Sequence, residues 1–485
     1  MSRIGMFFVL PVLLFSLNSA CSGDEKCPLD GRIRDLTQDG AFSPEDLANL
    51  EKLIQARPAF YASCGYVSEG SLDMELLWQE VHRLCPGCEG PKEGPAQPFN
   101  YSAYIENSGS MDGYVNGNTE FKEALSNLLS DIKIRDLADT LDMYYINAKK
   151  SRFPGKMEDF ILNLTPKTFR DRRTAPGTTD IANLIREVVE QAPSNEISLI
   201  ASDFIFSAGK GNNSKDHLTS QEIKLKNIFS GLLHERPERE LVFIKLRSKF
   251  SGTYYDYEEG LHSVDARRPY YVLVLGPSAG MKAFMDRIDV TRISGYENHY
   301  YLKLQDGDAL PYKVTQYHKG GSMFRPCTQN PATCIQNPVP AGRGAQEGIF
   351  QFSLAVDLSG IYLDESALAD VAHYAVTPGS YTLAEVKRIS AEEREKDPTL
   401  EAYSHFLVLQ SDQPALGTIR VSLLDELPEW VAASNSMDDR NQEGAELDST
   451  FGLLYLISGM HEAFQARSPG YARTHLFQLE IEVNR

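Results

Sequence analysis

Residues 99–111 read FNYSAYIENSGSM, and this stretch decides the expected fold. Tyr101 to Glu106 is an apolar run that predicts a strand. The chain then places an acid and two hydroxyls at alternate positions, Glu106, Ser108 and Ser110. In open α/β sheets ligands bind at the carboxyl ends of strands, and hard divalent cations prefer oxygen ligands. We therefore expect this loop to supply half of a metal-coordination shell.

Outward from this stretch, strand-like and helix-like segments alternate as far as residue 288. This alternation predicts an α/β fold with a doubly wound, mainly parallel sheet covered by helices on both faces. The expected strands are Tyr101–Glu106, Asp142–Asn147, Glu196–Ser202, Leu241–Leu246 and Tyr270–Leu275. The expected helices are Thr119–Ile132, Asp180–Gln191, Thr219–His234 and Ser278–Ile288.

Two later pieces extend the loop motif. Gly177-Thr-Thr-Asp180 precedes the clearest amphipathic helix, and Ser198 to Asp203 is an apolar strand that ends in an acid. Together with residues 104–111, these pieces resemble the von Willebrand factor A family. The metal-ion-dependent adhesion site of that family has an Asp-x-Ser-x-Ser loop, a Thr on a second loop and an Asp after a later strand. The resemblance covers roughly residues 99–288.

The resemblance implies a site for Mg²⁺ or Mn²⁺. Its expected ligands, direct or through water, are Glu106, Ser108, Ser110, Thr179 and Asp203, with Thr178 as the second match to the family's threonine. Glu106 stands where the family has Asp, so its carboxylate sits one methylene further out. In the family, the metal keeps one position open for an acidic side chain of a partner. The implied function is therefore protein binding or adhesion, without catalysis.

The pattern of apolar and polar residues changes after residue 290. Phe350 to Leu358, Ile419 to Leu423 and Phe477 to Val483 alternate apolar and polar residues. This period of two predicts antiparallel strands with one solvated face. Phe451–Phe464 is expected to be a helix inserted before the last strand. We therefore expect a β-sandwich-like domain over residues 290–485.

The N-terminus indicates export. Arg3 is followed by an apolar run from Ile4 to Leu17 and then by small residues, which is typical of a signal peptide over residues 1–20. The run is too short to cross a membrane as a helix. Residues 17–21, Leu-Asn-Ser-Ala-Cys, resemble a bacterial lipobox, although its leucine stands one place early. We expect lipidation of Cys21 and a place in the cell envelope, in the outer membrane or the periplasm. Cleavage without lipidation is the alternative.

The cysteines fit an exported chain. Six remain beyond Cys21, an even number that favours disulfides. Cys327 and Cys334 are the expected local pair, because Pro326, Asn330 and Pro331 make that segment a tight loop. Cys85-Pro-Gly-Cys88 is open to three interpretations: a structural bridge, half of a zinc site or a redox motif.

Charge limits the choice of partners. The net charge of −19 argues against nucleic acid, which needs a clustered basic surface. Residues 21–98 contain helix signals followed by a Pro- and Gly-rich linker. The expected organisation is a signal peptide (1–20), a lipid-anchored helical stalk and linker (21–98), a von Willebrand A-like domain (99–289) and a β-sandwich-like domain (290–485).

Two other functions stay open at this stage. The chain could be a serine hydrolase of the envelope, with Ser110 or the Ser207/Lys210 pair as nucleophile. It could also be a structural envelope component whose metal site is degenerate. A zinc hydrolase is disfavoured, because the histidines lack metal-ligand spacing on a helix.

Overall fold

The chain divides into two compact units, Met1–Pro95 and Ala96–Arg485. The structure is a computed structural model. It describes residues 99–174, 180–305, 310–470 and 474–485, together with individual residues between 27 and 83. The signal peptide, Cys21, Cys85 and Cys88 lie outside the described residues, so the predictions for them stay predictions.

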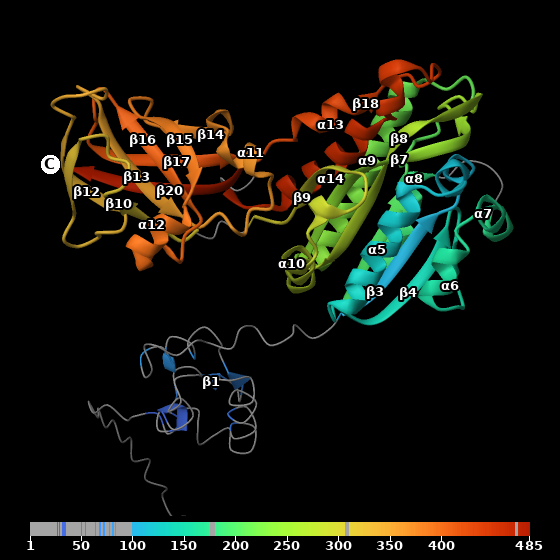
Figure 1. Cartoon of the computed structure of the whole chain (residues 1–485), viewed down its shortest axis with the longest axis horizontal. Helices are drawn as coiled ribbons and strands as arrows, with labels where there is room; N and C mark the ends of the chain where they lie inside the picture. Colours follow the sequence, from blue (N-terminus) through green and yellow to red (C-terminus); the bar gives the residue numbers. More distant parts are fainter. Residues whose placement is uncertain are drawn as a thin grey trace, which may run out of the picture. The chain divides into compact units, whose positions relative to one another are not determined.

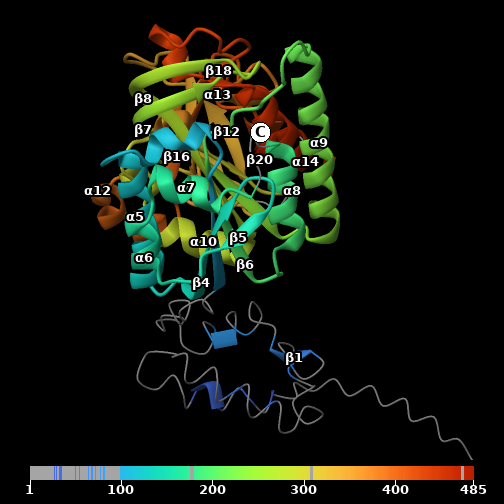
Figure 2. The same ribbon diagram turned by 90° about the vertical axis from the view of Figure 1, so that its right-hand side faces the viewer.

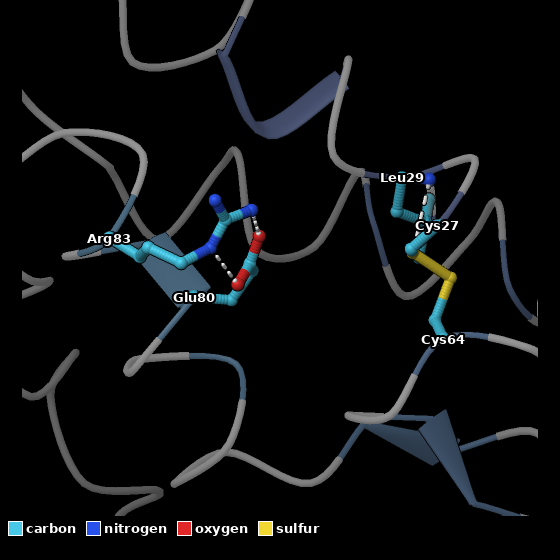
Figure 3. The surroundings of a disulfide bond; sticks show 5 residues. All are labelled: Cys27, Leu29, Cys64, Glu80 and Arg83. Atoms are coloured by element: carbon cyan, nitrogen blue, oxygen red, sulfur yellow. Dashed lines mark hydrogen bonds and ion pairs between the residues drawn. A yellow bond between two sulfur atoms is a disulfide. The ribbon is translucent and has the colours of Figure 1, made fainter. Parts of the chain in front are cut away.

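In the first unit a disulfide joins Cys27 to Cys64 (Figure 3). Strands β1 (Val67–Ser68) and β2 (Ser71–Leu72) pair antiparallel just after it. Leu50 and Ile54, which the sequence places on one helical face, are helical and buried.

A seven-stranded sheet forms the α/β part of the second unit, in the order β5-β4-β3-β6-β8-β7-β9 (Figure 1). Strands β4, β3 and β6 pair in parallel, and the other neighbours are antiparallel. Because β7 is antiparallel to β8, four of the seven strands share one direction. The bounds are β3 Phe99–Glu106, β4 Ala138–Ile146, β5 Lys150–Arg152, β6 Glu196–Ser202, β7 Arg239–Tyr255, β8 Leu261–Pro277 and β9 Tyr296–Leu302.

Helices cover both faces of this sheet, as the alternation predicts (Figure 2). Thr119 and Asp180 cap α5 and α8 through their side chains, which fixes where these helices begin. One face packs on α5 (Glu120–Ile134), α6 (Met157–Leu162), α7 (Pro166–Arg172) and α10 (Ser278–Arg287). The other packs on α8 (Ile181–Gln191), α9 (Ser214–Glu235) and α14 (Leu453–Arg467).

Strands β7 and β8 form one long hairpin. The sequence predicts two shorter strands, 241–246 and 270–275, in a mainly parallel sheet. The structure pairs them antiparallel along their whole length, from Arg239↔Pro277 to Tyr255↔Leu261. The short connection over 256–260 is the reason, because a parallel pair needs a crossover of a dozen residues or more. The tip of the hairpin packs against the short helix η1 (Ser110–Val115) and so supports the predicted metal loop.

Part of the C-terminal sequence belongs to the α/β sheet and its cover. The alternating pattern predicts a β-sandwich over residues 290–485, but β9 pairs with β7 at the edge of the seven-stranded sheet. The predicted helix over 451–464 is confirmed as α14, and it packs along α9, where Phe464 meets Phe229. Its buried apolar side chains explain this placement, because they complete the core on that face.

Nine of the other described strands of the second unit form two sheets around one shared core, and β18 (Asn435–Ser436) and β19 (Thr450–Phe451) form a separate parallel pair. The strands predicted around Phe352, Val421 and Leu479 all contribute buried side chains to that core. The Cys327–Cys334 disulfide predicted from the sequence is present. One sheet has the order β10 (Tyr312–Thr315), β13 (Phe350–Val356), β16 (His405–Ser411), β15 (Thr382–Arg388). The other has the order β11 (Met323–Pro326), β12 (Cys334–Val339), β20 (His475–Asn484), β17 (Gly417–Leu424), β14 (Tyr374–Thr377).

Gly113 allows the close contact between η1 and the hairpin. A Cβ atom at this position would lie 2.4 Å from Cε2 of Phe250. We expect Gly113→Ala to lower the free energy of unfolding by about 1–3 kcal/mol, because it overpacks the contact. Urea denaturation of the full chain measures the change. The control is Gly231→Ala on α9, where nothing lies within 4 Å of the new Cβ and a gain of about 1 kcal/mol is expected. Equal losses in both variants would contradict the packing argument.

Candidate metal site at the carboxyl ends of β3 and β6

Two neighbouring parallel strands bring the predicted acids together. Ile105 of β3 is in register with Ala201 of β6, so Glu106 and Ser202 end their strands side by side. Asp203 follows directly. Glu106 is 1% exposed and Asp203 is 2% exposed. The site is therefore a pair of buried carboxyl groups at the edge where α/β sheets bind ligands.

Ser202 fixes one of these carboxylates. Its hydroxyl donates to Oε2 of Glu106 and accepts the backbone N–H of Phe204 at 2.8 Å. Phe204 has a positive φ of 48°, so the chain turns sharply just beyond Asp203. Ser202 itself is fully buried. The longer side chain of Glu106 is thus held by the neighbouring strand.

Asp203 lies in an environment that is short of positive charge. Burial, and then the neighbouring charge of Glu106, raise its pKa to about 7. Hydrogen bonds from the Ser110 hydroxyl and the Ile205 backbone N–H, together with the Arg268 charge, act in the opposite direction. A divalent cation beside the two acids would supply the charge that these groups only partly provide.

The two serines complete the cluster. The hydroxyl oxygens of Ser108 and Ser110 are 3.0 Å apart, and Ser110 also bonds to Asp203. Ser108 is buried, whereas Ser110 is partly exposed, so the cluster meets solvent at Ser110. Two carboxylates and two hydroxyls form an all-oxygen donor set that fits Mg²⁺ or Mn²⁺.

An arginine holds the loop from outside. Arg173 donates to the carbonyl oxygens of Asn107 and Ser108 at 2.7 and 2.9 Å and to Asp112 at 2.9 Å. Asn107 in turn donates to the carbonyl of Phe169 at 3.0 Å. These bonds tie the loop to the C-terminal end of α7. No local pattern in the sequence marks Arg173 for this role.

Glycine is required inside the same loop. A Cβ atom on Gly109 would lie 2.8 Å from Cε2 of Tyr255 at the tip of the β7–β8 hairpin. The approach of this aromatic ring fixes the backbone between the two serines. It explains why a residue without a side chain separates them.

Thr179, its alternative Thr178 and the rest of 175–179 lie outside the described residues. The described residue before this segment is anchored at the same edge of the sheet, because the backbone N–H and hydroxyl of Thr174 donate to Oδ1 of Asn147, next to the end of β4. After the segment, Asp180 accepts the backbone N–H of Asn183 as the cap of α8. The role of Thr179 stays a prediction.

A second buried network lies behind the site. Arg268 is 1% exposed, lies over the ring of Tyr254 at 4.1 Å and donates to Gln442. Asp439 accepts the hydroxyl of Tyr254 and the backbone N–H of Tyr257. The sequence singles out Tyr254 and Tyr257 only as an aromatic cluster, and it does not mark Arg268, Gln442 or Asp439, because these partners are far apart in the chain. Ser202 could have been found, since it lies next to Asp203 at the end of the predicted strand.

Among the described residues, neither serine of the hydrolase alternatives is hydrogen-bonded to a histidine or a lysine. Among the described residues, the hydroxyl of Ser110 bonds to Ser108 and Asp203, and no histidine or lysine joins them. Within the same described part, the buried hydroxyl of Ser207 has no hydrogen-bond partner, while Lys210 is exposed. A serine nucleophile needs an adjacent base.

The described residues contain no group of three or more His, Cys, Asp or Glu side chains placed to hold a metal ion, so a metal here would rely on the serine hydroxyls. No family model and no curated protein matches this chain. Across the described part of the chain, no helix combines the length and apolar character needed to span a membrane.

Proposed function

We propose that this chain is an extracytoplasmic binding protein that uses a divalent metal to hold a protein partner. The observation that carries the proposal is the convergence of Glu106, Ser108, Ser110 and Asp203 at one edge of the sheet. The order of these groups along the chain resembles the adhesion site of the von Willebrand factor A family. Mg²⁺ or Mn²⁺ is the proposed ion, and an acidic side chain of the partner would complete its shell.

The proposal includes the membrane tether predicted from the N-terminus. A lipid on Cys21 would hold the described units at a membrane of the cell envelope, because more than one acyl chain gives stable anchoring. Mass spectrometry of the protein extracted from envelopes tests this part by itself. A mature N-terminus without the added lipid mass would leave a soluble extracytoplasmic binding protein.

Titration calorimetry of the mature chain with Mg²⁺ and Mn²⁺ tests the metal site. We expect Ser110→Ala to weaken binding about tenfold or more, because it removes a ligand and the hydrogen bond to Asp203. Ser207→Ala is the control, since Ser207 is a serine outside the cluster. Absence of metal binding by the wild-type chain, or equal binding by the Ser110 variant, would refute the metal site.

A further inference from the structure

A basic segment borders the candidate metal site of this acidic protein. Residues 148–174 contain eight Lys or Arg and three Asp or Glu, a net charge of +5 in a chain of net charge −19. The segment starts just after β4 and ends just after α7. Four of its cations, which we call the basic patch, lie near the site: Lys149, Lys150, Arg170 and Arg172.

Hydrogen bonds place the basic patch beside the serine loop. The backbone N–H of Lys149 donates to the hydroxyl of Thr174 at 3.1 Å, and the hydroxyl oxygen lies 3.2 Å from the Lys149 carbonyl oxygen. The end of β4 therefore lies against the end of α7. Arg170 reaches Asp112 on η1 at 3.4 Å. Helix α7 itself contacts η1.

Most of the positive charge of the basic patch is not paired with acidic side chains of the described residues. Lys149, Arg170 and Arg172 are exposed, and Lys150 is partly exposed. Among the described residues, Lys149, Lys150 and Arg172 have no acidic partner within 4.0 Å, and Asp112 is shared between Arg170 and Arg173. Arg152 and Lys167 of the segment are paired instead, with Asp142 at 2.5 Å and with Asp171 at 2.7 Å.

We propose that the basic patch docks an acidic segment of a protein partner beside the Ser108–Ser110 loop. This inference deepens the proposed function, on which it rests for the placement of one partner carboxylate at the metal. The patch consists of a few separate cations, with Asp112 and Asp171 between them. This spacing suits the separate carboxylate groups of an acidic protein segment. A phosphate-rich polymer or an anionic bilayer needs a broader basic face than these four cations provide.

Fluorescence anisotropy with a short labelled peptide of alternating Glu and Gly tests the patch in the mature chain. We expect Lys149→Glu and Arg172→Glu each to weaken binding about fivefold, and the double variant more than tenfold. Arg343→Glu is the matched control, because Arg343 is exposed on the β-sandwich and has no ion pair among the described residues. Its binding should stay within about twofold. Circular dichroism checks that all variants fold.

The outcomes separate this inference from the metal site. Loss on Arg172→Glu that persists with chelator, or in Ser110→Ala, supports the patch whatever the metal titration shows. Wild-type metal binding without peptide binding, or an equal loss in the Arg343 variant, overturns the patch. Tighter binding to phosphatidylglycerol vesicles than to the peptide would also overturn it, because the surface would then recognise a membrane.

Discussion

Replacing Asp203 by asparagine is expected to change how the stability of the β3–β6 edge depends on pH. The pKa of Asp203 is raised to about 7 by burial and by Glu106, whereas an aspartate in the unfolded chain titrates at its ordinary value of 3.8. Between these two values the folded state keeps a proton that the unfolded state has lost. The free energy of unfolding therefore falls as the pH rises through this window, and the decrease ends above about pH 7.

The expected size of this effect is large. A shift of about three pKa units corresponds to about 4 kcal/mol across the window. Hydrogen exchange of the β6 amides in chelator, from pH 4 to 8, measures it locally in wild type and in Asp203→Asn. The difference between the two proteins should follow the titration, because the asparagine cannot ionise. Parallel pH profiles for both would contradict the buried acid pair.

Removing the buried cation behind the site is the second large effect. Arg268 lies on Tyr254, donates to Gln442 and lowers the pKa values of Asp203 and Asp439 by its charge. Arg268→Met keeps much of the side-chain volume but leaves these buried acids without their nearest cation. We expect a loss of about 3–5 kcal/mol in the free energy of unfolding.

The neighbouring residue provides the control. Arg267 is half exposed and pairs with Glu120 at 2.8 Å, so Arg267→Met should cost less than about 1 kcal/mol. Urea denaturation of the full chain compares the two variants. Similar losses would mean that the Arg268 charge is not needed, and a retained pH profile for Asp203 in Arg268→Met would mean that the two groups are not coupled.

Glu106 stands where the family that this loop resembles has an aspartate. A glutamate can occupy the first position of the serine loop because Ser202, on the next strand, holds its carboxylate. The register of β3 and β6 sets this contact. The proposed metal site therefore depends on strand pairing as much as on the loop motif itself.

The sequence by itself determined the local elements. Periodicity located β3, β6, α5, α8 and α10 to within a few residues, because amphipathic spacing and caps such as Thr119 and Asp180 act over one or two turns. It placed the start of α9 five residues late and did not predict α6 and α7. It also identified the acids and serines that meet at the site, since the carboxyl ends of neighbouring parallel strands share one edge. The Cys327–Cys334 disulfide followed from its short loop.

Only the tertiary structure decided which distant groups complete these elements. In the structure, two short predicted strands are parts of the long β7–β8 hairpin, and α14 packs against α9. It also placed Gln442 against Arg268 and Asp439 against Tyr254. Residues so far apart in the chain come into contact only when the core is packed and the buried charges are paired. The energy of these contacts depends on the whole folded structure, so no local sequence pattern predicts them.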